Sequence, residues 1–264
     1  MTRIRALLAK EFLDLLRNRA ALIPVAAVVL MSLALPLFVV IGMPHLTGHT
    51  LAEDNGLQQI AEIAGVRADL SPEGRIQVFM LQQFLMLFLL TPITGAMALA
   101  AHSVVGEKQA RTLEPLLATP ITTIELLVAK VLGALIPTLA ITLAGVAVYG
   151  LGIAATAAPG VASAMATLRT FILVFLVAPA AALTSLQAAL IISSRVNDPR
   201  TAQQFGVLII LPLTGLMVAQ FAGALWLSPA ALTMIGVALF GVWILLTLVS
   251  AAVFDRESIL TRWR

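Results

Sequence analysis

The chain has 264 residues, of which 60% are hydrophobic and 11% are charged, and its formal net charge is +3. Soluble domains contain about 45–50% apolar and ~25% charged residues, so this chain has too little polar surface to cover a water-soluble globule. A disordered chain needs the opposite balance. The absence of cysteine excludes disulfides, thiolate metal sites and thiol nucleophiles. The composition is that of an integral membrane protein.

The charged residues are clustered, and the gaps between the clusters predict where the chain crosses a bilayer. A spanning helix needs about 20 mostly apolar residues. Five stretches contain no Asp, Glu, Lys or Arg, and the last is long enough for two spans that separate near Ser228-Pro229. The first stretch exceeds the ~7–15 residues of a signal-peptide core, so we interpret it as a span. We therefore predict an all-α integral membrane protein with six transmembrane helices, at about residues 20–43, 78–101, 127–152, 170–193, 205–226 and 230–254.

The distribution of basic residues predicts the orientation of these spans. Lys and Arg accumulate in cytoplasmic loops. An inside N-terminus places thirteen of the sixteen basic residues in cytoplasmic segments, against three outside, Arg67, Arg75 and Arg169. The outer loop 44–77 carries five acidic residues instead. We expect both termini in the cytoplasm, and Tyr149 near the outer end of its span, where aromatic residues favour the membrane interface.

The segment before the first span, residues 1–19, has a helical pattern of its own. Its charged residues Arg3, Lys10, Asp14 and Arg17 face away from an apolar stripe. A basic amphipathic helix of this kind lies in the membrane interface. The alternative is a cytoplasmic extension of the first span. We therefore divide the chain into an N-terminal interfacial helix, 1–19, and a six-span membrane domain, 20–264. The apolar stripe consists of Ile4, Leu7, Leu8, Phe12, Leu15 and Leu16.

The loop between the second and third spans contains two helix starts. Thr112 can cap a short helix of about two turns, which Pro120 would end. Thr122 followed by Glu125 has the spacing of a capping box and predicts that the helix of the third span begins here. The apolar residues of the short helix suit a groove on a partner protein. The alternative is a loop that packs on its own membrane domain. These apolar residues are Leu113, Leu116 and Leu117.

Several segments together carry a resemblance to a known family. They are the runs Gly106–Glu114, Leu116–Ile121 and Glu125–Lys130, the N-terminal run Leu8–Arg19 and the loop Arg195–Gln204. In these segments the chain resembles ABC type-2 transporter permeases, the membrane subunits of ATP-binding-cassette exporters. The family also has six spans with both ends inside.

The resemblance implies both partners and contact residues. A permease of this kind is driven by two copies of a cytoplasmic ABC ATPase subunit and pairs with a second permease copy or a homologue in the plasma membrane, surrounded by lipid; no nucleic acid is expected. The first inner loop would contain the coupling helix that docks on the ATPase, and the second inner loop would make a smaller contact. The implied contact residues are Glu107, Arg111, Thr112, Leu113, Glu114 and Leu117 in the first loop and Arg195, Asp198 and Arg200 in the second.

The sequence lacks the motifs of an ATPase or a metalloenzyme. No glycine is followed by lysine, so the phosphate-binding loop and its lysine are absent. We therefore expect no catalysis and no bound cofactor in this chain, with ATP and Mg²⁺ held by the partner subunit. His45 and His49 are four residues apart, but two histidines lack the third and fourth ligands of a zinc site. We interpret them as part of a solvated loop and expect no metal.

The predicted spans contain no ionisable residue at depth, which argues against an ion-coupled carrier. Gln82, Gln83 and Gln187 are candidates to line a substrate pathway, although an interhelical hydrogen bond is the alternative for the first two. A pathway without charge suits an apolar or amphiphilic cargo. A stand-alone secondary carrier and a membrane scaffold remain as alternatives. Prolines kink the spans as hinges or as static bends. They are Pro24, Pro36, Pro92, Pro137, Pro179 and Pro212.

Overall fold

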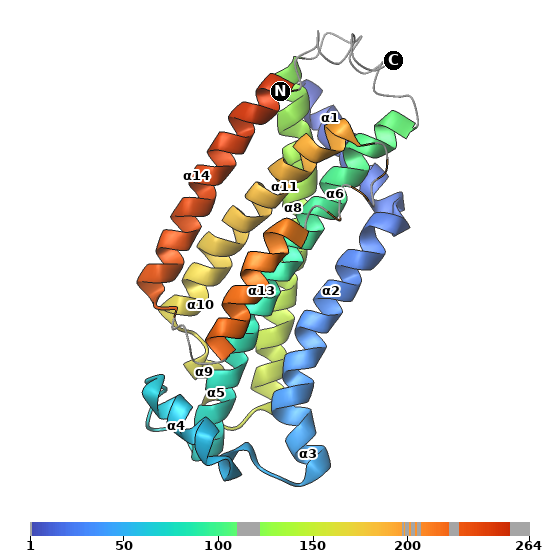
Figure 1. The fold of residues 1–264 in the computed structure, drawn as a ribbon. Helices are drawn as coiled ribbons and strands as arrows, with labels where there is room; N and C mark the ends of the chain where they lie inside the picture. The colour runs from blue at the N-terminus through green and yellow to red at the C-terminus, as the bar shows by residue number, and fades with distance from the viewer. Residues whose placement is uncertain are drawn as a thin grey trace.

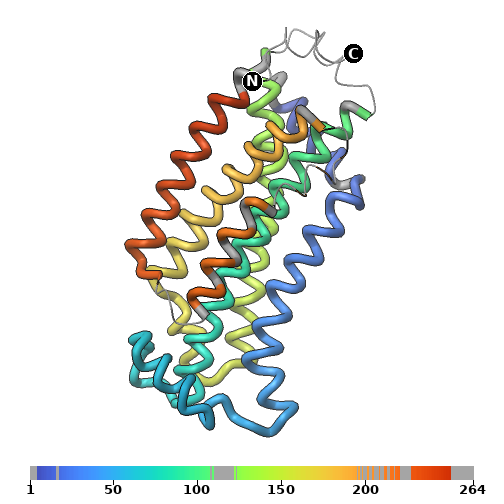
Figure 2. The backbone as a smooth tube through the Cα atoms, in the orientation of Figure 1, coloured from blue at the N-terminus to red at the C-terminus, as the bar shows by residue number. Residues whose placement is uncertain are grey.

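The fold is known from a computed structural model, which describes residues 2–109, 122–196, 198, 201, 204, 207–221 and 227–253. In these residues the chain is helical, without a strand, as the sequence predicts (Figure 1). The long helices run side by side in an elongated bundle. The described part of the chain begins and ends at the same end of this bundle (Figure 2).

Five helical segments of the described residues are long and apolar enough to cross a membrane: Arg19–Thr47, Pro72–Glu107, Ile124–Thr156, Leu168–Ser194 and Pro229–Ser250. They match the first four predicted spans and the last one. The elements that build them are α2 (Arg19–Leu37), the π-helical turn η1 (Phe38–Gly42) and α3 (Met43–Thr47); α5 (Pro72–Phe84), the 3-10 turn η3 (Leu85–Leu89) and α6 (Leu90–Gln109); α8 (Thr123–Thr156); α10 (Leu168–Ile172), the π-helical turn η4 (Leu173–Val177) and α11 (Ala178–Arg195); and α14 (Pro229–Val253).

The fifth predicted span, residues 205–226, is represented by α13 (Val207–Phe221). This helix has 15 residues, fewer than the ~20 that a membrane crossing needs. The remaining residues of the predicted span lie outside the described part of the chain. A sixth membrane crossing therefore stays a prediction, although α13 runs along the bundle beside the other helices (Figure 1).

The start of α8 confirms the capping box that the sequence predicts. The Thr122 backbone N–H donates to the Glu125 carboxylate at 2.9 Å, and the Glu125 N–H donates to the Thr122 hydroxyl at 3.2 Å. Each side chain thus satisfies a backbone donor that lacks a partner within the helix. This cap fixes where the third span leaves the preceding loop.

Three of the span prolines stand beside turns that depart from α-helical geometry. Pro36 precedes η1, Pro92 follows η3, and Pro179 follows η4. A proline cannot donate to the carbonyl four residues before it, and for Pro92 and Pro179 these carbonyls belong to Phe88 and Phe175, within η3 and η4. The chain therefore adopts locally tighter or wider turns at these positions. Pro36 itself lies inside α2, as Pro24 does, and Pro137 and Pro212 lie inside α8 and α13.

The centre of the bundle is the contact between α6 and α11, two helices that are rich in alanine. Ala96 and Ala100 on α6 and Ala182 and Ala189 on α11 are fully buried in one apolar cluster. Small side chains allow two helix backbones to approach closely, and this contact stabilises helix pairs where lipid removes much of the hydrophobic driving force. The remaining helices pack around this pair.

Tyr149 on α8 belongs to the interior of the protein. It is 2% exposed, its hydroxyl donates to the Leu81 carbonyl at 3.1 Å, and its ring lies 5.1 Å from the ring of Phe88. A buried tyrosine needs a partner for its hydroxyl, and a backbone carbonyl supplies it here. Tyr149 thus lies about two turns from the end of α8, near the predicted end of the span, but its ring is buried within the bundle.

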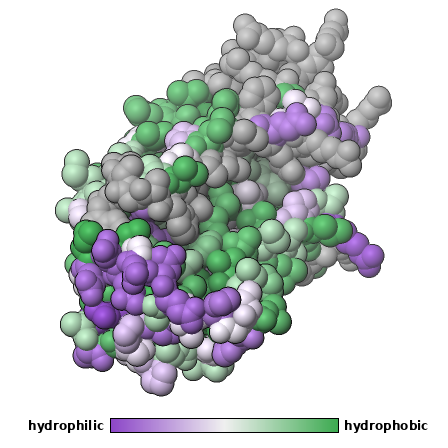
Figure 3. Space-filling model, turned by 60° about the horizontal axis from the view of Figure 1, so that its bottom comes forward, coloured by the Kyte–Doolittle hydropathy of each residue, from purple (hydrophilic) through white to green (hydrophobic). Residues whose placement is uncertain are grey.

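The segment 44–77 folds over the end of the bundle that is remote from α1. It contains the 3-10 turn η2 (Leu51–Glu53) and α4 (Asn55–Ile63), which packs on α5 through Ala61, next to the short α9 (Val161–Ala164). Hydrophilic side chains gather on this end, below an apolar flank (Figure 3). Gly48, with φ of 72°, ends α3 between the two histidines, and His49 pairs with Glu53 at 3.1 Å.

The N-terminal segment forms a separate helix, α1 (Thr2–Arg17), which ends before the N-cap Asn18 of α2. It packs against α8, and its buried face contains Leu7 and Glu11. A Cβ atom at Gly133 of α8 would lie 2.8 Å from the Glu11 Cβ, so only glycine permits this approach. The position of α1 in a membrane interface stays a prediction.

We expect Gly133→Ala to weaken the packing of α1 on α8, because the added methyl group would clash with the Cβ atom of Glu11. Gly150→Ala is the matched control: it lies on the same helix with no atom within 4 Å of the added Cβ. There alanine favours the helix by up to ~1 kcal/mol. Thermal unfolding and trypsin cleavage within α1, both in mild detergent, compare the two variants. Equal melting temperatures and equal cleavage would contradict the close approach.

Candidate functional site

A cluster of charged side chains joins α1, α6 and α8 at one end of the bundle. We call it the ion cluster and define it as Lys10, Glu11, Ser103, Glu107 and Lys130. The side chain of Lys130 is 1% exposed, and those of Glu107 and Glu11 are 7% and 9% exposed. Charges are rarely buried unless they are paired, because removing an ion from water is costly. The pairing within the cluster meets this requirement.

Lys130 is the centre of the ion cluster. Its ammonium lies 2.7 Å from Glu107 Oε2 and 3.4 Å from Glu11 Oε1. It also donates to the hydroxyl of Ser103 at 3.0 Å and to the carbonyl of Ser103 at 3.2 Å. The Ser103 hydroxyl in turn donates to Glu11 Oε2 at 2.9 Å. A single ammonium therefore holds three helices together.

Lys10 closes the ion cluster from the side of α1. It pairs with Glu107, with Glu11 at 3.5 Å and with the exposed Asp14 at 3.3 Å. Its partial burial alone would lower its pKa, but the hydrogen bond and charge of Glu107, with the charges of Glu11 and Asp14, raise the pKa above its ordinary value. Lys10 therefore remains protonated through the physiological pH range.

The ion cluster lies at the base of the first inner loop. Glu107 is two residues before Gln109, the last residue of α6, and Lys130 lies two helical turns into α8. Residues 110–121, which connect these helices, lie outside the described residues. Any force on this loop reaches the bundle through the two helix ends that the ion cluster connects.

The predicted contact residues of the inner loops are only partly described. Glu107 is buried in the ion cluster, so its carboxylate does not lie on the surface of the protein. In the second loop Asp198 is exposed and accepts from the N–H and hydroxyl of Thr201, both at 3.1 Å. Only the backbone of Arg195, at the end of α11, is described. The residues outside the described part are Arg111, Thr112, Leu113, Glu114, Leu117 and Arg200.

The three candidate pathway glutamines have different surroundings. Gln82 is half-buried on α5. Gln83 is 1% exposed, and its Oε1 accepts from Arg169 at 3.2 Å and from Gln220 of α13. Gln187 on α11 is fully buried, and neither amide atom has a partner among the described residues. The interhelical hydrogen bond that the sequence suggests is thus made by Gln83.

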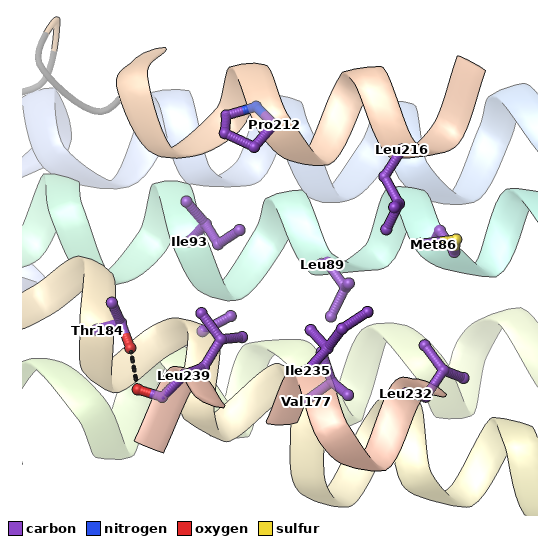
Figure 4. Close-up of a pocket in the computed structure, with 11 residues that line it drawn as sticks. Met86, Leu89, Ile93, Val177, Thr184, Pro212, Leu216, Leu232, Ile235 and Leu239 are labelled. Carbon is purple, nitrogen blue, oxygen red and sulfur yellow. Dashed lines mark hydrogen bonds between the residues drawn. The ribbon is translucent and has the colours of Figure 1, made fainter. Parts of the chain in front are cut away.

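A cavity of about 260 Å³ lies between α13 on one side and α6, α11 and α14 on the other (Figure 4). Pro212 and Leu216 of α13 form one wall. Thr184 is the one lining residue with a polar side chain, and its hydroxyl donates to the carbonyls of Ala180 and Leu239. The cavity is therefore apolar. The other lining residues are Met86, Leu89, Ile93, Val177, Ala181, Leu232, Ile235 and Leu239.

Sequence reasoning missed the ion cluster, although one signal was available. Glu11 lies four residues from both Leu7 and Leu15, so it falls on the apolar face of α1, where a charge requires a partner. The distribution of basic residues places Lys130 among the cytoplasmic charges, at the start of an apolar stretch. Nothing in the sequence relates it to Glu11, 119 residues away. Among the described residues no three His, Cys, Asp or Glu side chains form a metal-binding group.

The comparison with known families identifies the class of this protein. The sequence model of the family described as ABC-2 family transporter protein matches residues 5–232. A search of curated proteins found no significant match. Because the family match covers most of the chain, the chain belongs to the ABC-2 transporter family. It is a membrane transport component, a permease, of the kind that works with an ABC ATPase.

We expect Lys130→Met to destabilise the protein strongly, because it leaves two buried carboxylates with Lys10 as their remaining cation. Loss of one partner of a buried ion pair costs roughly 3–5 kcal/mol. Adding Glu107→Gln to Lys130→Met should recover part of the loss, since it removes one uncompensated charge. The apparent melting temperature in detergent measures these effects.

Asp69→Asn is the control for the ion cluster variants, because it breaks an exposed pair with Arg67 at 2.7 Å. Exposed pairs contribute little to stability, so no measurable change is expected. If Lys130→Met were tolerated as well as Asp69→Asn, the ion cluster would have no structural role.

Proposed function

We propose that this chain is the membrane-spanning permease subunit of an ABC exporter, which moves its substrate with ATP hydrolysed by a separate cytoplasmic subunit. The observation that carries the proposal is the family match over residues 5–232, combined with the five apolar spans. In the proposed orientation both termini, and the end of the bundle in which the ion cluster is buried, lie on the cytoplasmic side. The chain binds no cofactor itself; ATP and Mg²⁺ belong to the partner.

The proposed complex contains two ATPase subunits and two permeases, the second being another copy or a homologue. The exposed apolar side chains of the outer helices support this assembly, because they require lipid or a second membrane protein to cover them. They include Leu30 and Met31 on α2 and Val237 and Leu245 on α14. Lipid covers the part of this surface that the second permease leaves open.

In the proposed mechanism, closure of the ATPase pair on ATP displaces the first inner loop, which carries the coupling helix. The loop connects α6 and α8, and the ion cluster ties the ends of these helices to each other and to α1. We infer that α1, α6 and α8 move as one unit relative to α14, because separating them would expose unpaired buried charges. A movement of the loop is thereby passed to the spans instead of being absorbed at the helix ends.

The second inner loop supplies a smaller contact with the ATPase through Arg195, Asp198 and Arg200. Asp198 is exposed and follows α11, which packs along α6, and both helices end at the same end of the bundle (Figure 1). The two inner loops therefore lie at the same end of the bundle. This arrangement supports a single ATPase surface that contacts both loops.

We expect Glu114→Lys and Leu117→Asp to prevent co-purification of the ATPase subunit without unfolding the permease. The first reverses a charge and the second places a charge on the apolar face of the coupling helix. The measurement is the amount of ATPase that co-purifies with the tagged chain from its native host in mild detergent, with size-exclusion chromatography as the check of folding.

Glu62→Lys and Ile63→Asp are the matched controls, since they make the same changes at exposed positions on α4, at the opposite end of the bundle. They should retain the ATPase. A full yield of ATPase with both coupling-loop variants would reject the docking site, and a purified wild-type chain without any ATPase would reject the permease function.

A further inference from the structure

Arg169 is a cation without a counter-ion in the described residues. It is the only charged residue between Lys130 and Arg195 in the sequence. The side chain is half-buried near the start of α10, and its one described hydrogen bond is to Gln83 Oε1, a neutral acceptor. A guanidinium in this position attracts an anion from outside the chain.

The two glutamines beside Arg169 have polar atoms that their mutual contact does not use. Gln83 and Gln220 are each 1% exposed. Gln83 Oε1 accepts from both Arg169 and Gln220, which leaves Gln83 Nε2 and Gln220 Oε1 without a partner among the described residues. Buried amide atoms normally have partners. The site therefore offers one further donor and one further acceptor next to the guanidinium.

This polar group continues the wall of the apolar cavity. Gln83 is three residues before Met86, and Gln220 is four residues after Leu216, so each lies about one turn from a lining residue on the same helical face. Met86 and Leu216 stand together at one end of the cavity (Figure 4). Arg169, Gln83 and Gln220 therefore lie beyond one end of the apolar cavity. This end is the one remote from the ion cluster.

We propose that this site binds an amphiphile with one hydrocarbon chain in the cavity and an anionic head group at Arg169. The guanidinium and Gln83 Nε2 donate to the phosphate or carboxylate oxygens of the head, and Gln220 Oε1 accepts from a hydroxyl group on it. The cavity volume of about 260 Å³ has room for part of one hydrocarbon chain and none for a second chain. That the amphiphile is also the exported cargo would rest on the proposed permease function, whereas its binding does not.

The test measures binding to the purified chain alone, by native mass spectrometry in mild detergent. The probes are palmitoyl lysophosphatidylglycerol and palmitoyl lysophosphatidylcholine, which share the hydrocarbon chain and differ in head-group charge, and inorganic phosphate as the anion without a chain. Both lipids carry a phosphate, but the choline cation cancels its charge and is repelled by Arg169. We therefore expect the phosphatidylglycerol lipid to bind about tenfold more tightly than the choline lipid.

Two kinds of variant separate the head from the chain. Arg169→Gln should abolish the preference for the anionic lipid, and Arg169→Lys should retain most of it. Ala181→Leu extends a side chain into the cavity and should weaken both lipids equally. Arg67→Gln, which removes an exposed cation of the outer segment, is the control and should change nothing.

Three outcomes would overturn the proposal. They are equal binding of the two lipids to the wild-type chain, an unchanged preference in Arg169→Gln, and unaltered lipid binding in Ala181→Leu together with tight binding of inorganic phosphate. The last result would reveal an anion site without a place for a chain. Because no ATPase takes part, failure of this test leaves the permease function intact.

Discussion

The structure depends on the burial of the Lys130 ammonium between two carboxylates from different helices. This ion has the negative charges of Glu11 and Glu107 and the polar groups of Ser103 within reach, so it is satisfied only when α1, α6 and α8 are assembled. A buried ion pair adds little net stability over an apolar contact, but breaking it is costly. The main effect of the ion cluster is therefore to make separation of the three helices energetically costly.

The two ends of the bundle have different chemistry, and each suits a different task. At the end with α1, opposite charges neutralise each other inside the ion cluster and hold the base of the first inner loop. At the other end, Arg169 has no described counter-ion, and two buried amides retain unused polar atoms. Between them lie small and apolar side chains that pack α6 against α11. Charges that are paired within the protein make one end rigid, whereas polar groups without a partner among the described residues leave a place for a ligand at the other end.

The sequence predicts the features that depend on local signals. Charge-free stretches locate five spans, and the Thr122–Glu125 spacing locates the start of α8, because both depend on residues within one or two turns of each other. The ion cluster could not be predicted, because Lys130 and Glu11 meet only through tertiary packing across Gly133. For the same reason the sequence does not show that Arg169 contacts Gln83 or that the ring of Tyr149 is buried. Polar residues near span ends are ambiguous without the neighbouring helices.

The most direct test of this account is the distance between α1 and α8 in the complex with the ATPase. The chain contains no cysteine, so Leu13→Cys and Ile124→Cys provide the only sites for two spin labels, both at exposed positions. If the ion cluster holds α1 and α8 together, this distance is the same in the nucleotide-free and ATP-bound complexes. The distance between labels at Leu13→Cys and Val249→Cys, the latter on α14, changes instead. A Leu13–Ile124 distance that widens when ATP binds would contradict it.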